Sequence, residues 1–245
     1  MRRTYQLLCH GPALIVSLPD NSVNLARAAD AGGAQVLKVH INVHHDASGT
    51  HFGSLDEERP RLDAIRSAVN LPIGIVPGVT LRQAQGHPER SRGVTAAPRR
   101  DEVEALADMG FDFIDTFAHC FPSWLLGMER MTRVVAIDST YTVKAAASLA
   151  RVGMEILEAA VIPHAEYGQP LTAADLALYA RLAAAAPTPI IVPSQRRLEP
   201  HDVARLAAIG INGIMIGAIV TGLAPSTLEA ATRAFRAAVD ELSHT

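Results

Sequence analysis

Short apolar runs alternate with longer segments of mixed polarity along the chain. The runs have strand length and no helical gaps, which is typical of strands that are buried on both faces of a sheet. They predict strands at residues 13–18, 35–42, 72–78, 111–118, 133–139, 155–163, 189–194 and 211–216. The intervening segments predict helices at residues 21–33, 55–69, 101–110, 122–131, 140–153, 172–186, 199–210 and 226–242.

Eight strand–helix units in regular succession predict a parallel sheet, and closure into a barrel removes the exposed edges of such a sheet. A chain of 245 residues suits one α/β domain of this kind, which runs to about 250 residues. We therefore predict a single (β/α)8 TIM barrel over residues 1–245.

Residues 83–100 interrupt the alternation after the third predicted strand. This stretch contains two prolines, two glycines and hardly any large apolar residue, so it has no face to bury in a core. We predict a flexible insertion here. A functional lid over the active face of the barrel is the alternative interpretation.

Composition and charge argue against several classes of function. A net charge of −3 and an aromatic content of 4% provide neither the basic stripe nor the stacking platform of a nucleic-acid-binding protein. The apolar runs are too short to span a membrane, and no signal-peptide core follows Met1. Cys9 and Cys120 form neither a disulfide framework nor a zinc motif. We expect a cytoplasmic protein without nucleic-acid or membrane partners, and we leave a homodimer open.

The second predicted strand carries the sharpest chemical signal. Its period of two places Lys38, His40 and Asn42 on one face, and the opposite apolar face must meet the helices. The polar face then points into the barrel, where a buried lysine needs a carboxylate or an anionic ligand. The candidate carboxylate partners on strands four to six are Asp115, Asp138 and Glu158. Such a lysine is either an internal ion pair that only fills the barrel, or an acid, base or ligand-binding group.

Two loops that follow predicted strands add further polar side chains. Four histidines lie within residues 40–51, but their spacing matches no metal-binding motif, so we expect hydrogen bonds to a ligand and no metal or cofactor. His164 and Tyr167 follow strand six and suit contacts with substrate hydroxyls, unless this loop is only solvated. Nothing in the sequence marks Cys120 as an activated thiolate.

The last two units predict a phosphate site. Strand eight ends in Gly217 and Ala218, whose small side chains let a ligand approach backbone N–H groups at the start of a short helix. Ser194, Gln195 and Arg196 end strand seven, and loops seven and eight hold phosphate groups together in barrels of this kind. A last strand with a tight turn is the alternative interpretation.

Successive blocks of the chain resemble N-acetylmannosamine-6-phosphate 2-epimerases, which belong to the ribulose-phosphate-binding barrels. The blocks are LLCHGPALIVS, AADAGGAQVLKV, PIGIVPG, AIDSTYTVKAAASLARVG and RRLEPHDVARLAAIGINGIMIGAIVTG. The resemblance implies that Lys38 takes the place of a substrate-contacting arginine and that Asp138 matches the strand-five aspartate. It also implies that Arg196, Gly217 and Ala218 match the phosphate site, and that residues 164–168 match the strand-six loop.

The chain departs from that family at two positions. Pro77 and Gly78 stand where the family has a catalytic lysine, and Ser194 and Gln195 replace a glutamate and a glycine. Epimerisation next to a carbonyl needs a base and an acid, so the lysine change removes one half of the family's pair.

We predict an isomerase or epimerase that acts by proton transfer on a small phosphorylated sugar or a related phosphometabolite. Its catalytic residues would be Lys38, Asp138 and Glu158, and its substrate-binding residues His40, Asn42, Asp115, His164 and Tyr167. Two alternatives remain open. One is a lyase or aldolase in which Lys38 forms a Schiff base with a phosphorylated carbonyl compound, and the other is a barrel that binds a phosphometabolite without catalysis.

Overall fold

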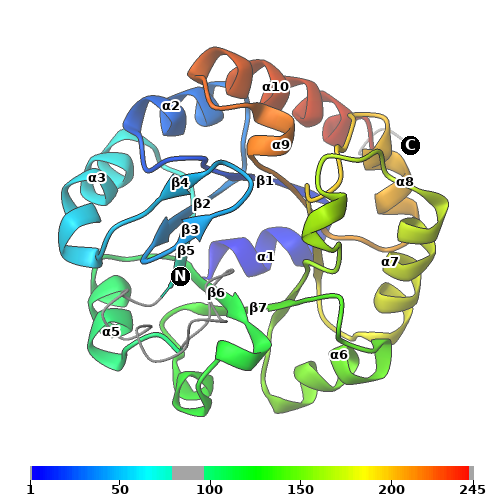
Figure 1. Ribbon diagram of the computed structural model, residues 1–245, viewed down its shortest axis with the longest axis horizontal. Helices are drawn as coiled ribbons and strands as arrows, with labels where there is room; N and C mark the ends of the chain where they lie inside the picture. Colours follow the sequence, from blue (N-terminus) through cyan, green and yellow to red (C-terminus); the bar gives the residue numbers. More distant parts are fainter. Residues whose placement is uncertain (1, 79–96, 243–245) are drawn as a thin grey trace.

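Eight parallel strands close into a barrel in the computed structural model, which describes residues 2–78 and 97–242 (Figure 1). Their order around the barrel is β1-β10-β9-β8-β7-β6-β5-β2, so neighbouring strands also follow one another in the chain. The strands are β1 (Ala13–Ser17), β2 (Val36–Ile41), β5 (Ile73–Pro77), β6 (Phe113–Phe117), β7 (Thr132–Ile137), β8 (Ile156–Ala159), β9 (Ile190–Pro193) and β10 (Gly213–Ile216). The predicted single (β/α)8 barrel is confirmed.

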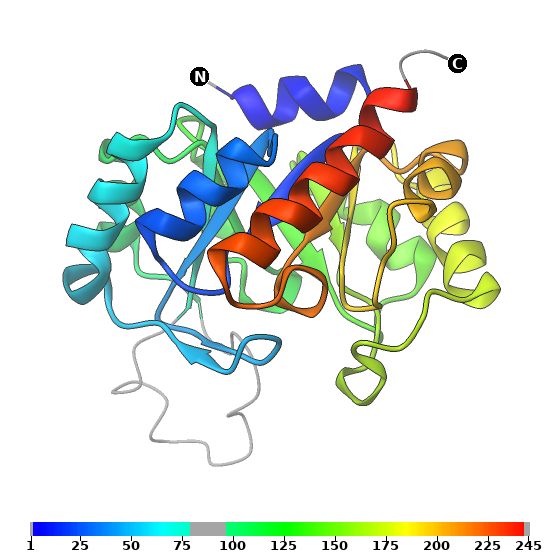
Figure 2. The same ribbon diagram turned by 90° about the horizontal axis from the view of Figure 1, so that it is seen from above.

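Helices surround the barrel and cover the outer faces of the strands (Figure 1). They are α2 (Val23–Ala31), α3 (Leu55–Ala68), α5 (Arg100–Asp108), α6 (Val143–Leu149), α7 (Ala173–Ala185), α8 (Asp202–Ala208) and α10 (Pro225–Glu241). The short helix α9 (Ala218–Thr221) lies inside this ring, directly after β10 (Figure 1). A further helix, α1 (Arg3–His10), lies across one end of the barrel, opposite the end that carries the long loops (Figure 2). No helix in the described part of the chain is long and apolar enough to cross a membrane.

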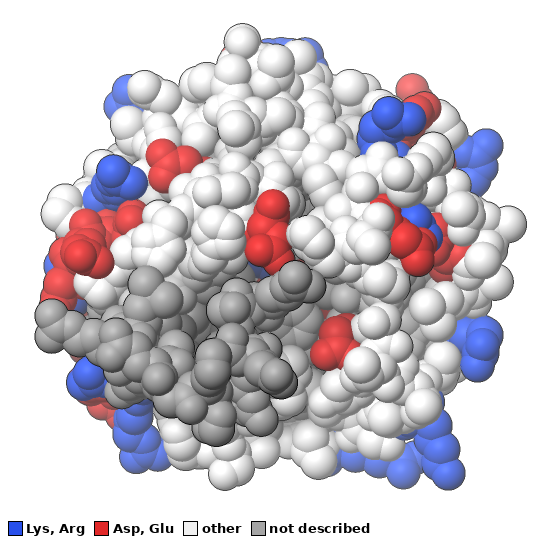
Figure 3. All heavy atoms as spheres, viewed as in Figure 1, with Lys and Arg blue, Asp and Glu red and all other residues white. Residues whose placement is uncertain are grey.

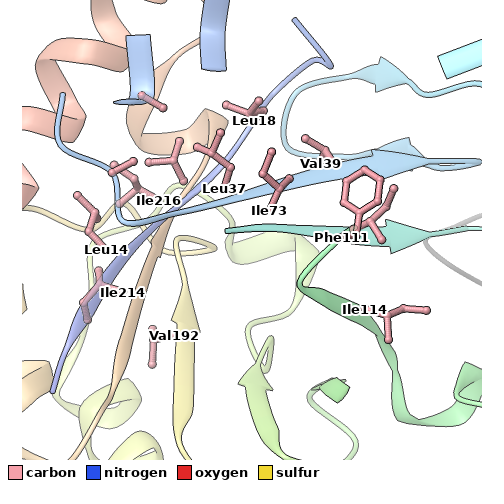
Figure 4. Packing of buried hydrophobic residues seen from close by; sticks show 14 of the residues in the cluster. Leu14, Leu18, Leu37, Val39, Ile73, Phe111, Ile114, Val192, Ile214 and Ile216 are labelled. Atoms are coloured by element: carbon pink, nitrogen blue, oxygen red, sulfur yellow. The ribbon is translucent and has the colours of Figure 1, made fainter. Parts of the chain in front are cut away.

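The main core lies between the strands and the helices. Outward-facing side chains such as Leu14, Leu37, Ile214 and Ile216 are fully buried there, and Figure 4 shows them packed together with side chains from neighbouring strands. The outer faces of the strands are apolar because they meet helices all around the barrel. This packing explains the continuous apolar runs of the sequence.

The interior of the barrel is apolar at the end next to α1. Leu8 of α1 closes this end above a layer of inward-facing side chains. Phe113 fills the middle of the interior because Gly74 faces it: a Cβ atom at Gly74 would lie 1.9 Å from the Phe113 ring. The apolar cluster consists of Leu8, Ala13, Ile15, Val36, Phe113, Val134, Ile156, Ile191 and Met215. This half of the interior is a packed core, which leaves the carboxyl ends of the strands for chemistry.

Several local elements differ from the sequence prediction. Helix α1 was not predicted, and the predicted loop after strand two contains a short hairpin of β3 (His44–His45) and β4 (Thr50–His51). The predicted helix at 122–131 is replaced by the 3-10 turn η2 (Ser123–Gly127). Three further 3-10 turns, η1 (Ala118–Cys120), η3 (Ala150–Val152) and η4 (His164–Glu166), follow β6, α6 and β8. Most of the predicted insertion at 83–100 lies outside the described residues.

Candidate active site

A cavity of about 570 Å³ opens at the carboxyl ends of the strands. Its lining comes from β1, β2, β5, β6, β8, β9 and β10 and from the loops that follow β2, β6, β7, β8, β9 and β10, so distant parts of the chain meet there. This is the end of a (β/α)8 barrel where active sites form. The volume lies in the range of small-molecule sites.

The floor of the cavity is a buried cluster of one lysine and two carboxyl groups. Lys38 Nζ lies 2.6 Å from Asp115 Oδ2 and 2.7 Å from Glu158 Oε2. The three side chains are 7%, 2% and 8% exposed, and they come from β2, β6 and β8. Lys38 and Glu158 line the cavity, whereas Asp115 is not among the described residues that line it. The structure therefore brings together Lys38 and two of its three predicted partners.

The environment pushes the pKa values of these two carboxyl groups in opposite directions. Burial would raise the pKa of Asp115, but the Lys38 ammonium group outweighs burial and lowers it. Burial and the adjacent charge of Asp115 raise the pKa of Glu158 well above its usual value. For Lys38, burial opposes the charged form, but the charges of Asp115 and Glu158 outweigh it and raise its pKa. The cluster thus favours a lysine cation beside an aspartate anion, and it makes Glu158 the more easily protonated of the two carboxyl groups.

Two neutral imidazoles form the wall beside Lys38. His40 is 2% exposed, and its Nδ1 atom has no hydrogen-bond partner among the described residues. Burial, followed by the proximity of His45 and Lys38, lowers the pKa of His40 well below its usual value. Burial likewise lowers the pKa of His45 to about 4, and the two rings lie 4.8 Å apart. A neutral imidazole offers a ligand one donor and one acceptor.

The mouth of the cavity is built from the loops that follow β2, β7 and β8. Asp46 of the β3–β4 hairpin lies 3.9 Å from His164 Nε2, which belongs to η4. Asp138, which follows β7, also lines the cavity, and its Oδ1 atom accepts hydrogen bonds from the backbone N and the Oγ1 of Thr140. Its Oδ2 atom lies 3.9 Å from Nδ1 of His119, a lining residue that the sequence reasoning did not select.

The predicted phosphate end of the cavity lies where β9 and β10 finish. Ser194 Oγ accepts a hydrogen bond of 2.9 Å from the Gly217 backbone N–H, which ties the two loops together. Gln195 is fixed by hydrogen bonds to the backbone of Ile162 and to the hydroxyl of Tyr167. The lining residues from these two loops are Pro193, Ser194, Gln195, Gly217, Ala218 and Ile219.

Neither the backbone conformation nor the packing at position 217 requires a glycine. Its φ of −141° suits any residue, and a Cβ atom there would meet nothing closer than 3.6 Å. At Gly213, in contrast, a Cβ atom would lie 2.8 Å from Ile191. Because Gly217 lines the cavity, its missing side chain leaves room for a ligand next to the backbone.

Two predicted site residues occupy different places. Arg196 is not among the described residues that line the cavity, because its guanidinium group binds Asp175 and Glu166. Asn42 follows the end of β2 with a φ of 55°, and its amide group donates to Glu102 Oε1 instead of facing the cavity with Lys38 and His40. Both are corrections to the predicted set.

The sequence reasoning missed one further lining residue on β1. Ser17 lines the cavity, and the alternation Ala13, Ile15, Ser17 predicts its inward direction. Its polarity at the carboxyl end of a strand was the available signal. No group of three or more His, Cys, Asp or Glu side chains within residues 2–78 and 97–242 has an arrangement that could hold a metal ion.

Solved structures with this fold include enzymes of different kinds. Tryptophan synthase from Mycobacterium tuberculosis matches with a TM-score of 0.70 and 17% identity over 97% of this chain and 98% of its own. Thiamine phosphate pyrophosphorylase from Pyrococcus furiosus matches with a TM-score of 0.61 and 14% identity over 94% of this chain and 96% of its own. N-acetylmannosamine-6-phosphate 2-epimerase from Clostridium perfringens matches with a TM-score of 0.59 and 15% identity over 85% of this chain and 87% of its own. No family model and no curated protein sequence matches the chain. At these identities the similarity shows the barrel fold alone.

Proposed function

We propose that the cavity binds a small phosphorylated sugar or a related phosphometabolite and isomerises or epimerises it by proton transfer. The observation that carries this proposal is the cluster at the cavity floor, where Lys38 lies between Asp115 and Glu158. A cation beside a carboxyl group with a raised pKa suits a reaction that builds negative charge on a carbonyl oxygen.

Each lining group of the floor has a role in this reaction. Lys38, held as a cation, polarises the carbonyl and stabilises the enolate oxygen that forms when a neighbouring carbon loses its proton. Glu158, whose pKa is raised, supplies a proton from its acid form to that oxygen or to the carbon. Asp138, at the mouth and with Oδ2 directed towards His119, accepts the proton that leaves the carbon.

The walls and the loops after β9 and β10 would hold the rest of the substrate. Neutral His40 and the Tyr167 hydroxyl suit contacts with sugar hydroxyls, and His164 approaches from the mouth. The open space beside Gly217, next to Ser194, suits a phosphate group. A precedent on this fold is the structurally similar N-acetylmannosamine-6-phosphate 2-epimerase, whose substrate is a phosphorylated sugar.

The charge state of Lys38 argues against a Schiff-base lyase. Schiff-base formation needs a neutral amine that attacks a carbonyl, and the neighbouring carboxyl groups raise the pKa of Lys38 and keep it protonated. An aldolase would need Lys38 to lose its proton, which these two carboxyl groups oppose. We therefore place proton transfer ahead of this second candidate function.

A ligand screen tests the proposal. Phosphorylated aldoses, ketoses and acylated aminosugars, each paired with its unphosphorylated form, are added to the wild-type protein and to Lys38→Met in a thermal-shift assay. A ligand at 100 times its Kd stabilises the folded state by about 2.7 kcal/mol. We expect shifts with at least one phosphorylated sugar but not with its unphosphorylated form, and smaller shifts for Lys38→Met. Equal shifts for both forms, or none with the whole panel, would overturn the proposal. Binding without turnover would identify a non-catalytic barrel.

A further inference from the structure

A second hollow lies on the outside of the barrel, between α6 and α7, and shares no lining residue with the cavity at the carboxyl ends of the strands. It has a volume of about 560 Å³. Its walls are apolar, since Val143 and Ala147 of α6 face Pro187 just beyond the end of α7. Three cations line it as well, namely Lys144, Arg151 and Arg181, and no acidic residue of the described chain does.

The positions of these cations follow from the helices. Lys144 and Arg151 are seven residues apart along α6 and η3, which places them two turns apart on one side. They are the only charged residues in 143–152. Helix α7 carries one acidic residue, Asp175, and one basic residue, Arg181. Because Asp175 is bound by Arg196 and Thr172, it does not neutralise the hollow.

The three cations also lack acidic partners. Within the described residues, none of them forms an ion pair or a side-chain hydrogen bond. On α8 and α10, in contrast, Arg205, Arg233 and Arg236 each contact a carboxylate on their own helix. Figure 3 shows basic atoms along the lower right rim, where Figure 1 places α6 and α7, without acidic atoms beside them on the described part of that face.

We propose that this hollow is a binding site for a small organic polyphosphate, meaning a molecule with at least two phosphate groups on an apolar or aromatic body. Two guanidinium forks and one ammonium group match several phosphate oxygens, and the mutual repulsion of three unpaired cations is relieved when an anion binds. The apolar walls suit the body of the ligand, and the volume lies in the range of small-molecule sites.

Isothermal titration of the full-length protein with ADP and with inorganic pyrophosphate tests this site. We expect both probes to bind the wild type, with ADP tighter because its base contacts the apolar walls. Arg151→Ala combined with Arg181→Ala should raise the Kd of ADP at least tenfold. The matched control is Arg27→Ala, which removes an exposed arginine from α2 and should leave the Kd unchanged.

A second variant covers the case in which the double variant folds poorly. Ala147→Leu keeps all three cations and fills the hollow, so it should weaken ADP more than pyrophosphate. If neither the double arginine variant nor Ala147→Leu changes the Kd of ADP, ADP binds outside this hollow and the proposal is overturned. The absence of binding to the wild type at millimolar ADP would also overturn it. Equal Kd values for ADP and pyrophosphate would overturn the part that concerns the apolar walls.

Discussion

Lys38 and Arg196 are both predicted functional cations, and in the structure each of them contacts two acidic side chains. Lys38 contacts Asp115 and Glu158 inside the barrel, and Arg196 contacts Asp175 and Glu166 outside the cavity lining. All three members of the first cluster are less than 10% exposed, whereas the side chain of Glu166 is 48% exposed. The two clusters have similar composition but different access to a ligand.

The difference lies in what the acidic partners do to the cation and to each other. Around Lys38 the pKa of the second carboxyl group, that of Glu158, is raised, so a carboxyl group that binds a proton readily lies next to the cavity. Around Arg196 the contacts connect the η4 loop and the first turn of α7 to the end of β9, which stabilises the framework of the mouth. A cation with two acidic neighbours is therefore a functional signal only when a cavity reaches it.

The largest effect is expected from Lys38→Met. Turnover should fall by on the order of 10² to 10⁴, because the carbonyl oxygen loses its cation. The free energy of unfolding should also fall by about 3–5 kcal/mol, because Asp115 is left buried without its partner. Initial rates and urea unfolding measure the two quantities. Turnover at the wild-type level in a folded variant would show that Lys38 only fills the barrel.

Glu158→Gln should separate catalysis from stability. The amide keeps the shape of the neutral acid but has no proton to transfer, so turnover should fall by on the order of 10². Lys38 keeps Asp115 as its partner, so the stability of the variant near neutral pH should not fall.

The pH dependence of unfolding gives an independent check on Glu158. Its pKa is higher in the folded state than the usual 4.5 of the unfolded chain, so the folded state binds the extra proton. This contribution to stability is complete below pH 4.5 and is lost as the pH rises towards the folded-state pKa. The wild type should therefore lose stability relative to Glu158→Gln as the pH rises, as measured by urea unfolding over that range. A constant difference would mean that Glu158 is ionised in the folded state.

An intermediate effect is expected at the phosphate end. Gly217→Val places a branched side chain where the structure leaves open space, so the Kd of the phosphorylated ligand should rise about tenfold, or 1.4 kcal/mol. The matched control is Gly213→Ala, whose Cβ atom would collide with Ile191; it should lower the melting temperature and leave the Kd of the folded fraction unchanged. If Gly217→Val binds the ligand normally, the phosphate lies elsewhere.

The smallest effect on chemistry is expected from Arg196→Met. Its contacts with Asp175 and Glu166 hold the mouth, so the free energy of unfolding should fall by about 1–2 kcal/mol, the lower figure reflecting the exposed side of Glu166. Turnover and the Kd of the phosphorylated ligand should change less than about threefold, which is under 1 kcal/mol. A large rise in Kd would instead return Arg196 to the phosphate site that its sequence position suggested.

Patterns within single strands predicted the barrel and its floor. The period of two on β2 gave the inward direction of Lys38 and His40, and it holds because β2 is regular from Val36 to Ile41. It failed at Asn42, where the strand has ended and the backbone turns to a positive φ. Strand periodicity thus predicts side-chain direction only within the hydrogen-bonded part of a strand.

At the mouth of the cavity, contacts between residues far apart in the chain limit what the sequence can predict. Arg196 follows β9 at the expected position, but no local pattern shows that Asp175, which also caps α7 through Thr172, accepts its guanidinium group. Helix α1 was missed for a similar reason, since its stability rests on Leu8 in the end of the barrel and on Asp112, which accepts the backbone N–H groups of Arg3 and Thr4. Both features depend on residues far apart in the chain.

Hydrogen exchange into a bound substrate tests the central claim most directly. The protein is incubated in D₂O with phosphorylated sugars that stabilise it, and NMR follows the C–H proton next to the carbonyl. We expect the wild type to replace this proton with deuterium, and Lys38→Met and Glu158→Gln to do so at least 10²-fold more slowly. No exchange with any bound sugar, or undiminished exchange in both variants, would rule out proton transfer by this cluster.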